Sequence, residues 1–215
     1  MTRVRRRNPK GEGGRLHHDI VDAATALIDE HGPDGLSLRA IARQAGVTAP
    51  AIYDHFDDLA DIRRAVVENT FARFAAFLAR GGRDHVEPTA RLTALCRAYV
   101  EFGLTRPQQY AVMFGAAAVP PSLRTLKTID NMPGAEAFTL LLEGIRACLD
   151  SGASPPEQTL EAAMAVWVGL HGYVGLRIAA PDFPWPPDDS LLDTVVSRLA
   201  GVRRPSVDQR HREKT

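Results

Sequence analysis

The sequence predicts an all-α protein with a small N-terminal helical domain and a larger C-terminal one. Apolar residues recur every three or four positions over most of the 215-residue chain, which is the spacing of one helix face. Glycine and proline clusters interrupt this pattern, and no stretch shows the sustained apolar/polar alternation of a half-buried strand. Hydrophobic residues make up 45% of the chain and charged residues 24%, which is enough to build a substantial core.

The first helix is expected from about Leu16 to Glu30, where apolar residues face one side and His31-Gly32-Pro33 ends the pattern. Residues 37–56 then predict two short helices joined by a sharp turn. Ser37 can cap the first helix through its side-chain oxygen, and Gly46 stands where a helix end favours a positive φ. Thr48 can cap the second helix, and Pro50 fits its first turn.

The second of these helices has small outward side chains at its leading end and hydrogen-bonding rings at its trailing end. The outward positions are Thr48, Ala49, Ala51, Tyr53 and His55. A short, slim helix of this kind can lie deep in the major groove of DNA. Residues 37–56 therefore predict a helix-turn-helix that binds double-stranded DNA.

The charge around this motif is unfavourable for DNA and is offset upstream. Residues 16–58 carry two arginines against eight acidic residues, a net charge of −6, whereas residues 1–15 carry six basic residues against one acidic residue, a net charge of +5. We expect residues 1–13 to form a disordered basic arm that anchors the protein electrostatically, with Arg5, Arg6 and Arg7 on phosphates or in a minor groove. The alternative is a solvated basic tail without a role.

Further helices follow along the chain. We expect a long one from Asp58 or Asp61 to about Ala79, stopped by Gly81-Gly82. The remaining helices are expected at about 89–104, 107–118, 133–149, 156–180 and 189–199, with a brief turn near 122–129. The proline-rich segment from Pro181 to Pro187 is expected to be a rigid connector.

Several segments together resemble the TetR family of bacterial transcriptional regulators. They are Ile20-Val-Asp-Ala-Ala, His31-Gly32, Leu36-Ser-Leu-Arg-Ala-Ile-Ala, Ala45-Gly-Val-Thr and Ile52-Tyr-Asp-His-Phe56. The resemblance implies an all-helical homodimer in which three N-terminal helices bind a palindromic operator and a C-terminal domain binds a small effector. It implies that Leu38 and Arg39 open the first helix of the motif against DNA, that Ala49, Pro50 and Ala51 face bases, and that Tyr53 and His55 hold phosphates. Ser37, which caps that helix, belongs to the same expected DNA-binding set. The sequence departs from the family at Asp57-Asp58-Leu59-Ala60-Asp61, where many members carry a phosphate-binding lysine.

The helix near 156–180 is apolar nearly all the way round, which is typical of a helix buried on two sides. Gly169, Gly172 and Gly175 lie three apart in it, and their small size favours close approach of another helix. We expect a two-fold dimer through residues 135–150 and 157–180. The run from Trp167 to Gly172 also resembles the Trp-His-Gly subgroup of these C-terminal domains.

An apolar effector pocket with a few polar tips is expected in the C-terminal domain. Its candidate lining residues are Tyr99, Phe102, Tyr110, Met113, Phe114, Phe138, Met164, Trp167 and His171. The alternative for each of them is an ordinary core position.

The remaining patterns favour no enzyme, metal site or cofactor. The seven histidines show no metal-cluster spacing, and Cys96 and Cys148 lie in apolar helical stretches without a CxxC pattern. No catalytic residue is therefore expected. The chain shows no secretory signal, and its most apolar run, residues 162–178, falls short of a bilayer span, so a cytoplasmic bacterial protein without a membrane partner is expected.

These observations predict four regions and one function. The regions are a disordered arm (1–13), a TetR-type DNA-binding domain (14–74), an effector-binding and dimerisation domain (75–200) and a polar basic tail (201–215). The expected function is a repressor released from its operator by a small, largely apolar effector. The alternative is a helical small-molecule or partner-binding module with weak DNA affinity.

Overall fold

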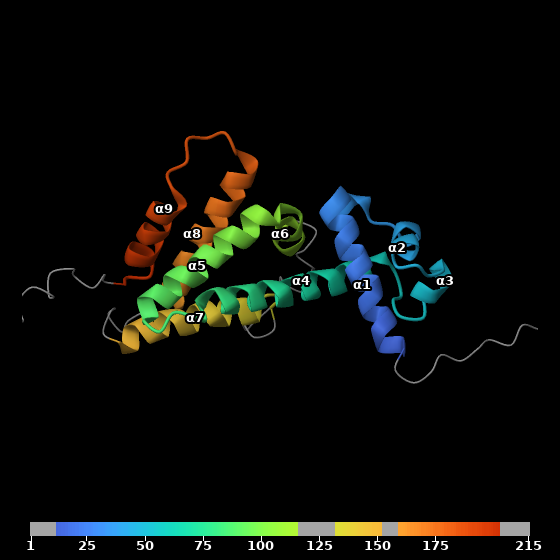
Figure 1. The fold of residues 1–215 in the computed structure, drawn as a ribbon, viewed down its shortest axis with the longest axis horizontal. Coiled ribbons are helices and arrows are strands. Elements are labelled where there is room, and N and C mark those ends of the chain that lie inside the picture. The colour runs from blue at the N-terminus through green and yellow to red at the C-terminus, as the bar shows by residue number, and fades with distance from the viewer. Residues whose placement is uncertain (1–11, 116–131, 152–158, 203–215) are drawn as a thin grey trace, which may run out of the picture. The chain divides into compact units, whose positions relative to one another are not determined.

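The computed structural model describes residues 12–115, 132–151 and 159–202. These ranges fold into the helices labelled in Figure 1, connected by turns and short loops, and they contain no strand. The predicted all-α class is confirmed. The basic arm with Arg5, Arg6 and Arg7, the turn expected near 122–129 and most of the predicted tail lie outside the described residues.

The chain divides into two compact units. The first, here called the head unit, holds Met1–Phe71 and Gln108–Leu126, and the second, the body unit, holds Ala72–Pro107 and Lys127–Thr215. The division falls inside one long helix, α4 (Leu59–Gly82), and directly before Gln108 in α6 (Pro107–Phe114). Most of α6 therefore belongs with the N-terminal helices in this structure.

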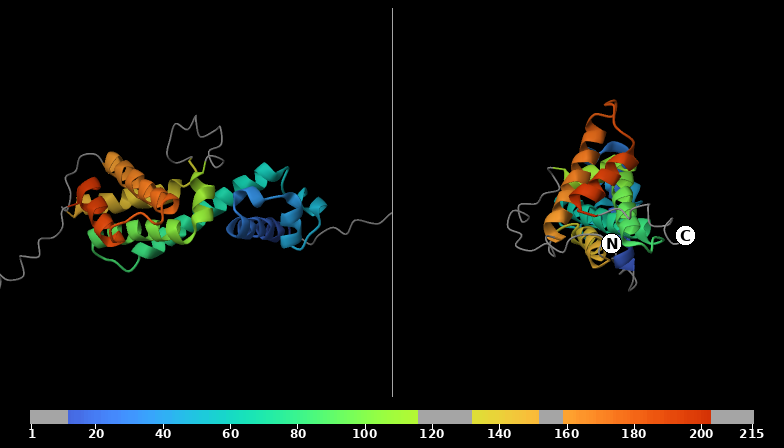
Figure 2. Two further views of the ribbon diagram at one scale, coloured as in Figure 1. Left: turned by 90° about the horizontal axis from the view of Figure 1, so that it is seen from above. Right: turned by 90° about the vertical axis from the view of Figure 1, so that its left-hand side faces the viewer.

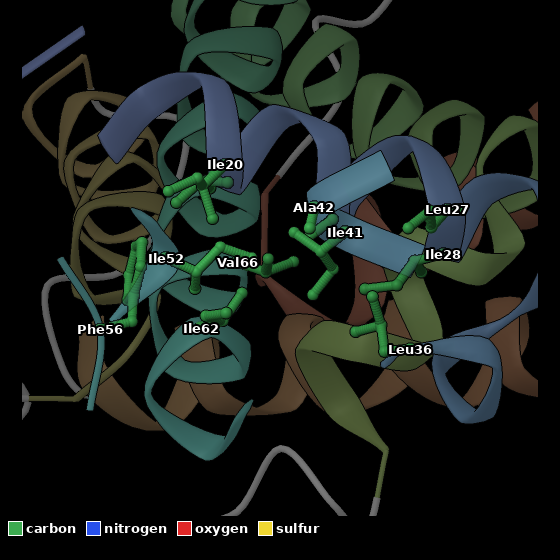
Figure 3. Packing of buried hydrophobic residues seen from close by; sticks show 12 residues of the cluster. Ile20, Leu27, Ile28, Leu36, Ile41, Ala42, Ile52, Phe56, Ile62 and Val66 are labelled. Atoms are coloured by element: carbon green, nitrogen blue, oxygen red, sulfur yellow. The ribbon is translucent and has the colours of Figure 1, made fainter. Parts of the chain in front are cut away.

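Three helices build the head unit with the start of α4. They are α1 (Glu12–His31), α2 (Leu38–Gln44) and α3 (Ala49–Ile52). Their apolar faces meet in one core, in which Ile20, Ile41 and Ile52 are completely buried (Figure 3). Each such side chain contributes about 1.5–3 kcal/mol by burial, so this core holds the short helices α2 and α3 in place.

Helix α4 begins with a reciprocal cap and ends in close packing. The Asp61 amide donates to Asp58 Oδ1 (2.8 Å), and Asp61 Oδ2 in turn accepts from the Asp57 amide (3.2 Å). The helix continues through Gly81 and Gly82 instead of stopping before them. A Cβ on Gly81 would lie 2.8 Å from the Ala98 Cβ, so this glycine serves the close packing of α4 on α5.

The body unit is built around α5 (Pro88–Thr105), α7 (Ala135–Asp150) and α8 (Thr159–Ala179), which pack on one another pairwise (Figure 2). Two shorter pieces close it, α9 (Asp188–Thr194) and a π-helical turn, Val195–Leu199. The connector before α9 is fastened to α8, because the Trp185 ring packs edge-on against Tyr173 and its Nε1 donates to the Ala180 carbonyl (2.9 Å).

The helix at Thr159–Ala179 is less buried than the sequence predicted. It spans 21 residues and is long and apolar enough, by length and composition alone, to cross a membrane, although only 28% of its most apolar 18-residue window is buried. The same helix carries exposed apolar side chains at Leu160, Met164, Val168, Leu176 and Ile178. It is therefore buried on one side only, and not on both as its composition suggested.

Candidate functional site

The helix-turn-helix is built by local hydrogen bonds that the sequence encodes. Ser37 Oγ accepts from the Ala40 amide (3.2 Å) and caps α2, as predicted. Gly46 has a φ of +68° and ends the motif's first helix, and the next amide, that of Val47, donates back to the Ala42 carbonyl (2.9 Å). The turn therefore separates α2 from α3, and Ile52 of α3 is buried in the head core.

The second helix of the motif is shorter than the sequence predicted. It covers only Ala49–Ile52, and the amides of His55 and Phe56 both donate to the Ile52 carbonyl, which forms a turn. Tyr53 and His55 therefore follow the helix instead of extending it. Thr48 takes the N-cap backbone conformation, but its side chain makes no capping hydrogen bond, which corrects the predicted role of that hydroxyl. Pro50 lies in the first turn, as expected.

The residues of this motif that are predicted to contact DNA differ in their exposure. Ser37, Arg39, Thr48, Pro50 and Tyr53 are exposed, and the Tyr53 side chain reaches 58% exposure. Leu38, Ala49, Ala51 and His55 are half-buried. Leu38 and Ala49 also pack against the head core, and the side chains at the start of α3 are small. This arrangement can present backbone and short side chains to a groove.

The acidic residues between α3 and α4 have a structural reason to be there. Asp58 and Asp61 cap α4, and Asp61 also pairs with Arg64 one turn on. Negative charge at a helix N-terminus is favourable because the unpaired amides there carry partial positive charge. The head surface nevertheless stays acidic, since all eight acidic residues in 16–58 are exposed.

The geometry described so far defines a class of protein. A three-helix head with a capped α2, a glycine turn and a short exposed α3 is a helix-turn-helix module for DNA, joined here to a separate helical body. The chain belongs to the tetR family of bacterial regulatory proteins: the model of that family matches residues 20–66, and the model described as the tetracyclin repressor-like C-terminal domain matches residues 92–199. It is a transcriptional regulator, and proteins of this family act by binding DNA and not by catalysis.

Individual relatives agree with this assignment. The uncharacterized HTH-type transcriptional regulator Rv0681 of Mycobacterium tuberculosis is 29% identical over 185 residues, which cover 86% of this chain and 80% of that protein. The HTH-type transcriptional repressor BepR of Brucella suis is 32% identical over 107 residues, covering 49% of this chain and 51% of BepR. Among solved structures, a Rhodococcus sp. RHA1 protein of unknown function shares the fold with a TM-score of 0.73 at 24% identity, covering 94% of this chain and all of that one.

The nine residues predicted to line an effector pocket fall into both units. Tyr110, Met113 and Phe114 belong to the head unit, and the other six belong to the body unit. In the body, the rings of Tyr99 and Phe102 pack edge-on against Phe74 of α4, with ring centroids 5.2 and 4.9 Å apart. These three rings pack directly against one another, so the space between them is filled in this structure.

Of the remaining predicted pocket residues, Met164, Trp167 and His171 share one side of α8, and Phe138 belongs to α7. The Trp167 ring lies 6.1 Å from Phe138 of α7 and 6.2 Å from His171, centroid to centroid. Trp167 and His171 are half-buried, whereas Met164 is 43% exposed. Burial lowers the pKa of His171 below its ordinary value of 6.5, so this imidazole is neutral at pH 7.

Two cavities lined by described residues of the body unit lie elsewhere. One of about 100 Å³ lies between the end of α4, α5 and α7, with Arg91 and Glu143 among otherwise mainly apolar residues; its lining includes Leu78, Leu92, Leu95 and Leu140. A second, more open groove of about 320 Å³ lies between α7, α8 and the π-helical turn, next to Arg198. Neither contains any of the predicted pocket residues.

The three glycines of α8 do not share one environment. A Cβ on Gly172 or Gly175 would meet nothing within 4 Å, so both face open space in the subunit. A Cβ on Gly169 would lie 2.9 Å from Leu199 Cδ1 of the same chain. The small size of Gly169 therefore serves packing of the π-helical turn within the subunit, and its place in a dimer interface stays a prediction.

Two further features bear on chemistry. Burial raises the pKa of the Cys96 thiol to about 12, with a smaller contribution from nearby Cys148, so Cys96 stays protonated and unreactive at neutral pH. No group of three or more metal-binding side chains gathers anywhere in the described part of the chain.

Sequence reasoning missed one buried polar contact, Gln109 to Asp29, because residues 80 positions apart leave no periodic signal.

Proposed function

We propose that this protein is a homodimeric repressor that binds a palindromic operator and releases it when a small, largely apolar effector occupies the body unit. The observation that carries the proposal is the exposed helix-turn-helix, with Arg39, Pro50 and Tyr53 on its outer surface. The sign of regulation is supported by the relative named as a repressor, BepR. A cytoplasmic location belongs to the same proposal.

The dimer is proposed to form through α8 with support from α7. Exposed apolar side chains at Leu160, Met164, Val168 and Leu176 are spaced by four or eight positions and form a row that winds gradually around α8, here called the α8 stripe. Gly172 lies in the same stripe and leaves room for a second helix. A dimer of this kind presents two α3 helices about 34–36 Å apart, or a multiple, to successive major grooves. The Trp-His-Gly subgroup, suggested by Trp167, His171 and Gly172, stays a prediction.

The effector is proposed to enter where Tyr99 and Phe102 now pack on Phe74. Because Phe74 lies on α4, parting these rings would shift α4, which continues into the head unit. Effector binding would then change the population of DNA-competent dimers without any covalent chemistry. Trp167 and His171 are proposed as the polar tips of the same pocket.

The basic arm is proposed to supply the electrostatic attraction that the acidic head lacks. The test is a gel shift with the duplex beside the protein's own gene, comparing the full chain with a truncation that starts at Gly14. Each lost phosphate contact flattens the dependence of log affinity on log salt by about 0.9, so losing Arg5, Arg6 and Arg7 should lower the slope by about 2–3. An unchanged slope would remove the arm from the proposal.

A second candidate function is favoured by the acidic surface of the head: a module that binds small molecules or protein partners and has little affinity for DNA. The same gel shift separates the two. A retarded complex that forms at low salt and dissolves with an apolar ligand supports the repressor. No complex with the full chain, even at the lowest salt, supports the alternative.

A further inference from the structure

Two arginines of the body unit share one aromatic ring. The Arg106 guanidinium, directly after α5, lies 4.9 Å from the centroid of the Phe77 ring of α4, and the Arg80 guanidinium lies 5.3 Å from the same centroid. Both distances are within the range at which a guanidinium is attracted to the face of a ring. The ring therefore holds two positive charges close to each other, here called the arginine pair.

No carboxylate neutralises the arginine pair. None of the ion pairs within the described ranges includes Arg80 or Arg106. Arg73 adds a third positive charge, because it lies four positions before Phe77 and so shares its side of α4. Glu101, the acidic residue of α5 closest in sequence to Arg106, is exposed and pairs with neither arginine. Since like charges repel, an anion bound between these guanidinium groups would be stabilised.

Arg106 is held in place before any anion binds. Its guanidinium also lies 5.1 Å from the centroid of the Phe102 ring, and its Nη1 donates to Thr105 Oγ1 (3.0 Å). Its amide donates to the Phe102 carbonyl (2.9 Å), and the residue is half-buried. A side chain fixed in this way loses little further conformational entropy when it binds a ligand.

Apolar rings adjoin the arginine pair. The Phe102 ring lies 5.6 Å from Phe77 and 4.9 Å from Phe74, centroid to centroid. Phe74 and Phe102 belong to the place where the effector is proposed to enter. A ligand that reached from these rings to the arginine pair would need an apolar stem and an anionic end. The planar guanidinium fork matches the two oxygens of a carboxylate.

We propose that Arg80 and Arg106 bind the carboxylate of the effector, and that the effector is therefore an organic acid with an apolar stem. The stem packs against Phe77 and Phe102. This proposal rests on the proposed function for the place of the stem, and it adds the charge of the ligand. A neutral molecule of the same length would leave the arginine pair without an anion.

The test compares acids with alcohols of the same carbon chain by isothermal titration calorimetry on the full chain without DNA. The probes are hexanoate, octanoate and decanoate, each paired with its 1-alkanol. A hydrogen bond to a charged group favours the acid, so the acid that binds best should bind about tenfold more tightly than its alcohol, or better. Equal affinities for acid and alcohol, or no binding of any acid, would overturn the proposal.

Substitutions then locate the anion. The double variant Arg80→Gln, Arg106→Gln should reduce the preference for the acid to less than about threefold, because glutamine carries no charge. Arg146→Gln is the matched control, since it removes an exposed arginine of α7, and it should keep the wild-type preference. A double variant that keeps the preference would place the anion on other cations, such as those of the basic arm, and would overturn the proposal.

A gel shift with the same probes separates this proposal from the proposed function. Release of the duplex by the acid at about a tenth of the alcohol concentration, or less, would support both. An acid that binds through the arginine pair but leaves the DNA complex intact would support the acid site and contradict release by an effector. Equal release by acid and alcohol would overturn the acid site and leave an apolar effector supported.

Discussion

Single residues explain why the sequence departs from the family pattern at a position expected to bind DNA. The acidic run from Asp57 to Asp61 stands where many relatives are expected to hold a phosphate with lysine, and its charges suggested a weakened DNA module. In the structure Asp58 and Asp61 satisfy amides at the start of α4. The acidic residues that stand in place of the lysine thus supply a helix cap, and under the proposed function the attraction to DNA comes from the basic arm.

Glu87 is a second capping residue, and its charge makes the stability of the body unit depend on pH. Burial alone would raise the pKa of Glu87, but hydrogen bonds from the amides of Thr89 and Ala90 outweigh it and hold the pKa below its ordinary value of 4.5. A carboxyl with a lowered folded-state pKa stabilises the protein above its unfolded pKa and loses this effect as pH falls through the folded value.

We therefore expect Glu87→Ala to lower the free energy of unfolding by about 1 kcal/mol at pH 7. The difference from the wild type should shrink below pH 4.5 as the wild-type carboxyl is protonated. Denaturant titrations from pH 3 to pH 7 measure this. Val86→Ala, at the neighbouring 98% exposed position, is the control. A difference that is constant with pH would contradict the capping role of the charge.

At the scale of elements, the turn between α2 and α3 depends on one backbone conformation. Gly46 has a φ of +68° with open space around its Cα, so a substitution there is penalised by backbone strain and not by contact. Gly46→Ala should lower the free energy of unfolding by about 1 kcal/mol or more, because L residues disfavour this region.

Gly14→Ala, in the same head unit, should have the opposite effect on the free energy of unfolding. A Cβ at Gly14 also meets nothing within 4 Å, but the residue lies in α1 at an ordinary φ. Alanine should therefore leave stability unchanged or raise it by up to about 1 kcal/mol. Thermal unfolding of the two variants checks both values. Equal effects at the two sites would show that conformation does not govern the turn.

The elements were predictable where local chemistry defines them. Ser37, Gly46 and Asp58 mark helix ends correctly, and the apolar spacing in α1 and α2 identified their buried faces. The prediction was wrong for the length of α3, because the turn after Ile52 depends on Phe56 packing into the head core. It was also wrong for the end of α4, where Gly81 packs on α5.

At the scale of the whole molecule, the α8 stripe is the surface that the proposed dimer must cover. Gly172→Arg should convert the dimer into monomers in sedimentation velocity at micromolar concentration. The charged side chain would be buried without a partner, at a cost of about 3–5 kcal/mol in association free energy. The wild type measured at the same concentration should remain dimeric.

Ala76→Arg is a suitable control, because Ala76 is exposed and belongs to α4, a different helix from the α8 stripe. It should leave the dimer intact. Gly169→Arg is unsuitable as a probe, since Gly169 packs against Leu199 of its own chain. An undisturbed dimer of the Gly172 variant would move the dimer interface away from α8.

The sequence by itself determined the helical class, the head and its helix-turn-helix, and the family, because caps, glycine turns and helical periodicity are local and each is readable over a few residues. Only the tertiary structure decided that α6 joins the head, that Gly169 faces inward while Gly172 does not, and that Tyr99 and Phe102 fill their own space against Phe74. Those outcomes depend on which apolar surfaces meet. Periodicity marks a surface as apolar, but the partner that buries it is selected by packing among residues far apart in the chain.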